Sequence, residues 1–209
     1  MSAQTQAPAF DAEFERLYRE GWDDTSSARR PDTRLRQSAA IRGEVVQAFL
    51  RDYRPLEQAT SEGLRAMLED GSAFRETGAA MDALGLDRDD LLDVLALHHA
   101  VHWAVVNRDR VRPEQLPAIR QAVASSSLMA GLASAGEAAR QEAADRASLL
   151  TAIRSREYGT LLQTRQSDAL RRYGEQVAAE FLSEHGIDLR DGDVARLPPL
   201  DTRESASSR

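Results

Sequence analysis

The chain of 209 residues contains no cysteine and no lysine, and both absences exclude whole classes of chemistry. Without cysteine there is no disulfide, no thiolate nucleophile and no cysteine-ligated zinc or iron–sulfur site. Without lysine there is no Schiff-base amine, no P-loop lysine and no lysine general base. Neither absence identifies the redox compartment, because a chain without thiols is stable in an oxidising or a reducing one.

Aromatic residues are also scarce, at 5% of the chain, so the core has to be built from leucine, alanine and valine. The net charge of −7 gives a surface that repels phosphate backbones, and we expect no nucleic-acid binding. No apolar run reaches the roughly 18 residues of a transmembrane helix, so we expect no membrane span. Residues 1–10 lack the pattern of a signal peptide, which favours a cytoplasmic protein and leaves export after processing open.

The spacing of apolar residues is helical throughout, and no segment shows the alternation that indicates a strand. We predict an all-α fold: an irregular bundle of about six helices around a central apolar helix, with a short N-terminal helical arm and a disordered C-terminal tail. The arm and its linker would take residues 1–33, the bundle 34–190 and the tail 191–209. A chain of this length can bury one such core.

The central helix is predicted over Leu91–Val106, where nearly every residue is apolar. A helix without a polar face belongs in the interior of its fold. The stretch GLDRDD marks its start. There Asp87 is the candidate N-cap, and Asp89 and Asp90 would lie in the first turn, where carboxylates suit the helix dipole.

The remaining helices are predicted from shorter apolar patterns at spacings of three and four. Proline and glycine mark several of their ends, because proline suits the first helical turn and glycine the position after the last. Between two of these helices, the small residues of SSSLMAGLASAGE predict a flexible joint. The predicted bounds are a start after Asp32, interruptions at Gly71 and Gly78, a start at Pro113, an alanine-rich helix over Ser134–Thr164 and a last helix from Ser167 to Gly186.

Three histidines stand inside the central helix, in the stretch LALHHAVHWAVV. His98 and His102 are four residues apart and share a helical face, so their rings can converge as in helix-borne zinc sites. A metal site needs a third ligand, and the HEXXH pattern of zinc hydrolases is absent. The sequence favours the alternative, in which one or two rings are buried and bonded to a carbonyl or carboxylate while the third faces solvent.

Other patterns that carry chemistry are absent from the sequence, including nucleotide-binding loops, the nucleophile elbow and the Glu-x-x-His motif of di-iron bundles. We therefore assign no catalytic residue and no cofactor-binding residue, and we expect no cofactor. Aromatic residues at helical spacing over residues 10–22 predict an amphipathic arm that needs a surface to dock on. The basic stretch of residues 154–172 predicts a solvated helix face, with an acidic or phosphate-bearing partner as the alternative.

Three segments follow a recognisable layout: MDALGLDRDDLLDVLALHHAVHWAVVNRDRV, QEAADRASLLTAIRSREYGTLL and RRYGEQVAAEFLSEHGIDL. They form a capped apolar helix, a glutamine- and alanine-rich helix and a final amphipathic helix. Over residues 64–189 this layout resembles a family of small bacterial all-helical proteins, the domain of unknown function of the DUF6683 type. The resemblance implies an all-helical fold and brings no activity and no catalytic residues.

These observations favour a non-enzymatic protein-interaction module, such as an adaptor, an inhibitor or an accessory part of a secretion or envelope system. Its partner would be another protein or a second copy of the chain. One alternative is a metal-binding protein or metal-dependent hydrolase that uses His98 and His102. Another is a carrier of a small ligand, held in a cavity beside the central helix and lined by leucine and valine next to Trp103.

Overall fold

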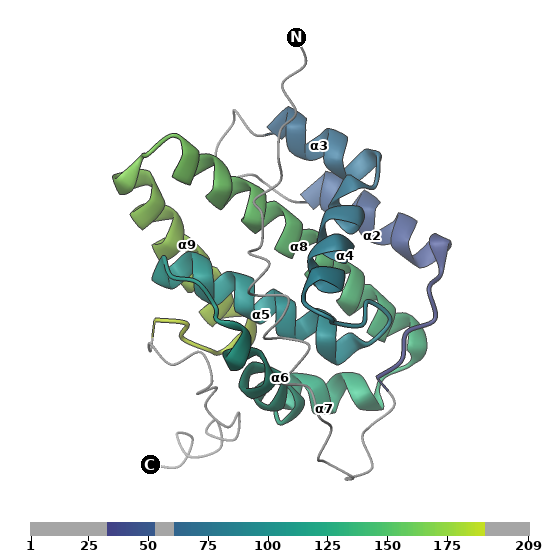
Figure 1. The fold of residues 1–209 in the computed structure, drawn as a ribbon. Helices are drawn as coiled ribbons and strands as arrows, with labels where there is room; N and C mark the ends of the chain where they lie inside the picture. Colours follow the sequence, from purple (N-terminus) through teal and green to yellow (C-terminus); the bar gives the residue numbers. More distant parts are fainter. Residues whose placement is uncertain (1–32, 53–60, 191–209) are drawn as a thin grey trace, which may run out of the picture.

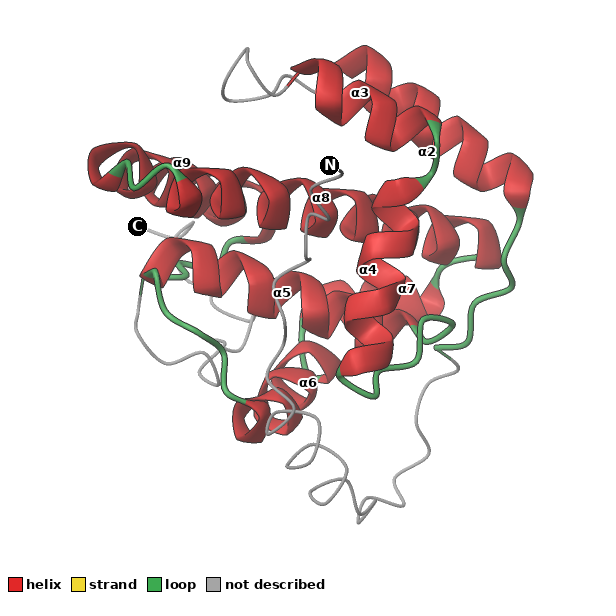
Figure 2. Ribbon diagram, turned by 45° about the horizontal axis from the view of Figure 1, so that its top comes forward, coloured by secondary structure: helices red, strands yellow, loops and turns green. Residues whose placement is uncertain are grey.

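The computed structural model describes residues 33–52 and 61–190, and within these ranges it contains eight α-helices and no strand (Figures 1 and 2). The all-α fold class is confirmed, with more helices than the six predicted. The predicted N-terminal arm and C-terminal tail lie outside the described residues. The helices are α2 (Ala39–Asp52), α3 (Ser61–Glu69), α4 (Ser72–Ala83), α5 (Leu91–Asn107), α6 (Leu116–Ala124), α7 (Ser127–Ser134), α8 (Glu137–Gln163) and α9 (Ser167–His185), and a 3-10 turn, η2 (Pro113–Gln115), precedes α6.

The apolar helix α5 lies inside the bundle, where it contacts α6, α8 and α9 (Figures 1 and 2). Its N-cap is Asp90, whose carboxylate accepts the backbone N–H of Leu92 at 2.9 Å. The prediction of Asp87 as the cap is therefore wrong. The carboxylate of Asp87 instead accepts the N–H of Asp89 at 2.9 Å, a local turn that competes with helix formation and delays the helix start.

The long helix α8 is a second interior element, in contact with α2, α4, α5, α7 and α9. Polar residues on it are buried and bind the segments that cover them. Gln141 is 1% exposed; its side chain accepts the Ser38 N–H at 2.8 Å and donates to the Ser38 carbonyl at 3.0 Å. Asp145 accepts from the guanidinium of Arg42 at 3.1 Å. These bonds hold the start of α2 against α8, as buried polar groups require.

The start of α2 at Ala39 is later than the predicted start after Asp32. The residues before it are extended and pair with the loop that leads into α5. The N–H of Leu35 donates to the Asp89 carbonyl at 2.8 Å, and the N–H of Leu91 donates to the Thr33 carbonyl at 2.9 Å. Backbone groups satisfied in this way have no need of helical partners.

The predicted flexible joint is a helix instead, because α7 occupies most of SSSLMAGLASAGE. The hydroxyl oxygen of Ser126 caps it by accepting the Met129 N–H at 3.1 Å, and Met129 is 1% exposed. Of the two predicted interruptions, Gly71 adopts a φ of 71° between α3 and α4, whereas Gly78 is buried within α4. Gly186, with a φ of 70°, ends α9 as predicted.

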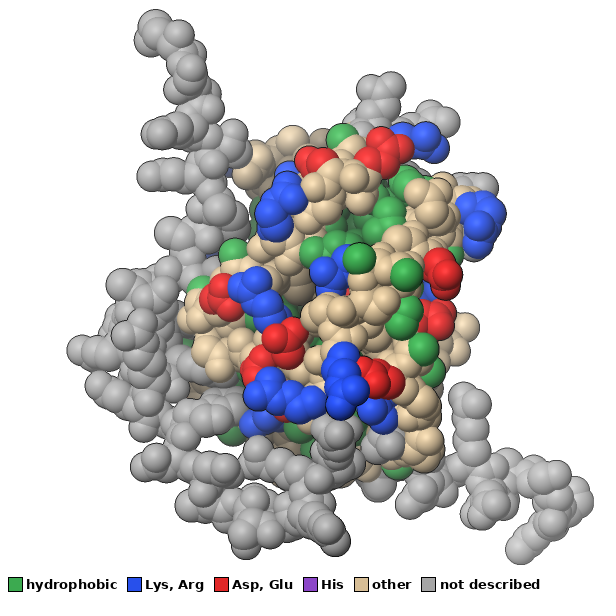
Figure 3. All heavy atoms as spheres, turned by 90° about the vertical axis from the view of Figure 1, so that its right-hand side faces the viewer, with side chains coloured by type: hydrophobic (Ala, Val, Ile, Leu, Met, Phe, Trp, Pro, Cys, Tyr) green, Lys and Arg blue, Asp and Glu red, His purple; other side chains and the backbone are tan. Residues whose placement is uncertain are grey.

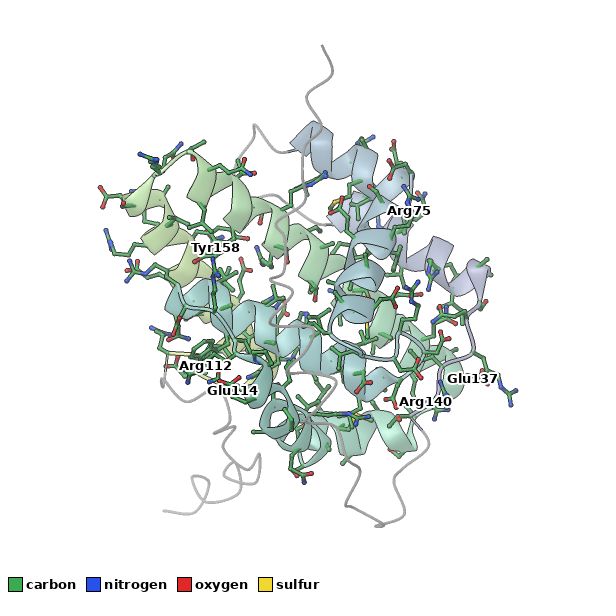
Figure 4. The ribbon with its side chains drawn as sticks, viewed as in Figure 1. Arg75, Arg112, Glu114, Glu137, Arg140 and Tyr158 are labelled. Carbon is green, nitrogen blue, oxygen red and sulfur yellow. The ribbon has the colours of Figure 1, made fainter. Side chains whose placement is uncertain are left out.

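Charged side chains on the surface form local pairs of opposite sign. On the face shown in Figure 3, arginine lies beside aspartate and glutamate, and no histidine is visible. Arg112 and Glu114 lie together at the start of η2, 3.4 Å apart (Figure 4). Exposed pairs of this kind contribute little to stability. Within the part of the chain that the structure describes, no helix has the length and apolarity needed to cross a membrane.

Helices α5 and α9 lie close together at Gly174. A Cβ atom there would lie 3.2 Å from the carbonyl oxygen of Val105 and 3.3 Å from that of Val106. These are backbone atoms of a buried helix, so they cannot turn away as a flexible side chain can.

We therefore expect Gly174→Ala to lower the free energy of unfolding by about 1 kcal/mol. The added methyl group costs roughly 1–3 kcal/mol against the α5 backbone, more than the roughly 0.5–1 kcal/mol that alanine gains over glycine in a helix. Urea denaturation measures the change. The control is Gly159→Ala in α8, where nothing lies within 4 Å of the added Cβ, and it should stabilise the protein. A gain in both variants would contradict the close approach.

Candidate functional site

All four histidines of the chain gather around one phenylalanine ring, that of Phe181 on α9. The ring centroids of His98 and His102 are 4.0 Å apart, and His185 at the end of α9 lies 6.0 Å from His98. The sequence predicted that His98 and His102 would be neighbours. It could not predict that His185 joins them, because that contact depends on how α9 packs against α5.

Two of the imidazoles have a defined tautomer. Nδ1 of His102 lies 2.7 Å from the His98 carbonyl oxygen, and Nδ1 of His98 lies 3.2 Å from the Ala147 carbonyl oxygen and 3.3 Å from the Thr151 hydroxyl. Since a carbonyl oxygen only accepts, Nδ1 carries the hydrogen in both rings and Nε2 is the acceptor. The prediction of buried rings bonded to carbonyls is right for this pair.

His99 differs from the prediction that one of the three rings faces solvent. It is 4% exposed, because Phe181 covers it with a ring-to-ring distance of 5.5 Å in an edge-on arrangement. No hydrogen bond joins the His99 side chain to any residue that the structure describes. The ring as a whole is therefore buried without a hydrogen bond in the described part of the chain, although neither of its nitrogens is among the fully buried atoms that lack a partner.

Burial keeps all four imidazoles neutral at pH 7. Loss of hydration lowers the pKa of His99 to about 4 and that of His102 to about 3. The pKa of His98 is lowered well below its ordinary value by burial and, secondarily, by the other histidines. The pKa of His185 is also lowered by burial, partly offset by the carboxylate of Glu184. Each ring thus offers hydrogen bonds and no charge.

A pocket of about 160 Å³ opens beside these rings, lined by residues of α5, α6, α7, α8 and α9. Its walls are mainly apolar, with three imidazoles among them. Trp103 is not part of the lining, so this pocket is not the one expected beside that residue. Exposed Arg146 and Glu184 supply its charged groups. The principal lining residues are Leu95, His98, His99, Leu128, Leu132, Ala143, Ala147, Phe181, His185 and Ile187.

Sequence reasoning missed this pocket for an identifiable reason. Leu128 and Leu132 line it from α7, in the stretch predicted to be a flexible joint. The one available signal was on α9, where Phe181 and His185 are four residues apart and so share a face. That spacing places an imidazole next to the buried ring, which the structure shows at 4.4 Å.

A cluster of charged residues lies between α8 and α9, and it contains Arg154, the one arginine of residues 154–172 that departs from the predicted solvated face. The other four are exposed: Arg156, Arg165, Arg171 and Arg172. Arg154 is 4% exposed and forms ion pairs with Glu157, at 3.4 Å, and with Glu180. The hydroxyl of Tyr173 donates to Glu157 at 2.6 Å. Burial raises the pKa of Glu157, against the opposing effects of Tyr173 and Arg154. The arginine thus finds its acidic partners within its own chain.

The candidate metal ligands His98 and His102 lie next to one another without a third ligand in place. Among residues 33–52 and 61–190, no group of three or more histidine, aspartate or glutamate side chains is arranged to hold a metal ion. The buried carboxylate of Asp93 faces Arg120, 2.6 Å away, rather than the imidazoles. Metal binding by the pair stays a prediction.

We expect the free energy of unfolding to fall when the pH is lowered from 7 to 5. The folded-state pKa values lie below the unfolded value of 6.5, so the unfolded chain takes up protons that the native state does not. The stabilisation is complete above about pH 6.5 and is lost as the pH falls toward those folded values. His99 and His102 should each account for about 2 kcal/mol of the loss.

Urea denaturation at the two pH values measures this dependence, above the range in which ordinary carboxylates titrate. The control is His99→Gln, which removes one titrating ring and should flatten the dependence by its share. An unfolding free energy that is the same at pH 7 and pH 5 would show that the rings are not buried in neutral form.

Comparisons of the chain with protein-family models, with curated proteins and with solved structures found no match. The resemblance of residues 64–189 to the DUF6683 type of domain therefore stays a prediction. The pocket and its histidines are therefore the features of the chain that bear on its function.

Proposed function

We propose that this protein is a non-enzymatic binding protein for a small, mainly apolar molecule held in the pocket between α5, α7, α8 and α9. The observation that carries the proposal is the pocket itself, a space of about 160 Å³ with apolar walls beside the histidine cluster. An apolar cavity of about 150 Å³ admits benzene or xenon, so the space suits a ligand with one small ring. Concave, mainly apolar sites with a few converging polar groups are typical of ligand binding.

The pocket is open to solvent on one side, where the exposed side chains of Leu128, Arg146 and Glu184 form its rim. Its inner walls are apolar and lack the contacts that a close-packed neighbour would supply. The pocket persists here because α8 presents the small side chains of Ala143 and Ala147 toward it. A bound molecule would restore the missing contacts.

The groups around the pocket favour binding over catalysis. The Ser126 hydroxyl is occupied, since it donates to the Val123 carbonyl at 2.6 Å and accepts the Met129 N–H at 3.1 Å. The carboxylate of Glu184 is 3.8 Å from Nε2 of His185, beyond hydrogen-bonding distance. A nucleophile activated by an adjacent base needs such contacts, and the described lining offers none.

We expect benzene to raise the melting temperature of the full chain by about 3–5 °C at roughly ten times its dissociation constant. Ala143→Phe fills the pocket and should abolish this rise. Ala139→Phe is the matched control, because Ala139 lies on the same helix, is exposed and does not line the pocket. Thermal unfolding with and without benzene measures both variants. An equal rise in the two would place benzene elsewhere and contradict the proposal.

A metal-binding role for His98 and His102 is the second candidate, supported by their tautomers. Metal-ligating histidines almost always donate their other ring N–H to a carbonyl or carboxylate. Both rings do so through Nδ1, which leaves Nε2 of each to bind a metal ion. His185, 6.0 Å from His98 by ring centroid, is the available third imidazole. Its side chain is partly exposed and near the end of α9.

On this candidate, the chain should bind about one zinc ion, and His98→Ala should weaken binding by about tenfold or more. His99→Ala is the control, since the neighbouring residue does not share the face of His98 and His102. Isothermal titration with zinc measures both. Weak, non-stoichiometric uptake, or equal losses in the two variants, would rule the pair out as ligands.

Contact with a protein partner or a second copy stays a prediction for the surface. The aromatic segment that motivated it lies outside the described residues. Leu128, Leu162 and Leu182 are exposed large hydrophobic side chains. Single exposed leucines are common on monomeric proteins, so they do not by themselves define an interface.

A further inference from the structure

We infer that the ligand of this pocket is a neutral molecule with a hydroxyl group, of the size of a phenol, and that His99 hydrogen-bonds that group. The inference rests on the proposed function and names the chemical class of its ligand. It is carried by the unused hydrogen-bonding capacity of His99 in the pocket wall.

His99 is the ring of the pocket wall that has no partner within the described part of the chain. The ring is 4% exposed and lines the pocket, and it makes no hydrogen bond to any described residue. Neither of its nitrogens is among the fully buried polar atoms without a partner, so a molecule in the pocket can reach them. His98, on the same wall, already uses Nδ1 on the Ala147 carbonyl, and only its Nε2 is left to accept. A ligand can therefore meet hydrogen-bonding groups of two adjacent rings.

The surroundings of these rings select the kind of ligand. His99 is 4% exposed and lies among mainly apolar walls, where an imidazole offers one donor and one acceptor. A hydroxyl group also donates and accepts, and it matches such a ring without bringing a charge into an apolar pocket. An aliphatic or aromatic hydrocarbon would fill the space and leave His99 unsatisfied.

An anionic ligand fits the site less well. The cation at the pocket is Arg146, an exposed side chain whose guanidinium carbon lies 5.5 Å from the ring centre of Phe49. Glu184, also at the pocket, would repel a carboxylate. A cationic ligand would have to leave water for walls that are mainly apolar.

The test compares phenol with toluene, which has the same shape and the same number of non-hydrogen atoms but no hydroxyl. Toluene is the more apolar, so a purely apolar pocket would bind it more tightly. We expect phenol to bind the full chain at least about tenfold more tightly than toluene, because toluene leaves the imidazole unsatisfied. His99→Phe should remove that preference, and Ala139→Phe, at an exposed position outside the lining, should keep it. Isothermal titration measures each affinity.

A second measurement on the unaltered protein does not depend on how the variants fold. Saturation with phenol should shift the imidazole ¹⁵N signals of His99 in NMR spectra, as hydrogen bonding at these nitrogens requires. Toluene bound as tightly as phenol, benzoate bound more tightly than either, or unchanged His99 nitrogen signals would overturn the inference. Failure of both phenol and toluene to bind would instead overturn the proposed function itself.

Discussion

The fold depends on enclosing α5, a helix with no polar face, together with the three imidazoles that it carries. A charged imidazole in this interior would lack the hydration that stabilises it, so burial favours the neutral rings and shields them from most of the solvent, although His98 and His99 also line the pocket. The shielding comes from particular contacts: the ring of His98 binds a carbonyl of α8, and Phe181 of α9 lies against all three rings. The histidines therefore determine where α8 and α9 meet the central helix.

The other interior helix, α8, is held in the interior by contacts between polar and charged side chains. Its composition is polar, and the residues that it turns inward include Gln141, Asp145, Arg154 and Glu157. Buried polar and charged groups destabilise a fold unless they have hydrogen-bonding or oppositely charged partners. Here the partners are Arg42 of α2 and Glu180 and Tyr173 of α9. Because each partner lies at one position on its helix, these pairs fix helix placement more narrowly than apolar contact does.

The sequence predicts those structural features that depend on neighbouring residues and on the spacing of apolar side chains. The bounds of α5, the stop at Gly186 and the shared face of His98 and His102 follow from spacing alone. It does not predict the interior position of α8, since apolar periodicity cannot detect a helix buried through ion pairs with distant residues. The helix α7 was missed because its stability depends on the Ser126 cap and on burial of Met129, a tertiary effect. The pocket forms only where residues of α5, α6, α7, α8 and α9 meet, so the sequence alone does not predict it.

Two features occur at the same place in this protein. One is the open space beside Ala143 and Ala147, whose small side chains leave room in the pocket. The other is the imidazole of His99, which lines that space and makes no hydrogen bond within the described part of the chain. A ligand that fills the space can also bond to the ring, whereas the candidate metal ligands His98 and His102 belong to no group of three or more ligands among the described residues. The pocket is therefore the stronger basis for function.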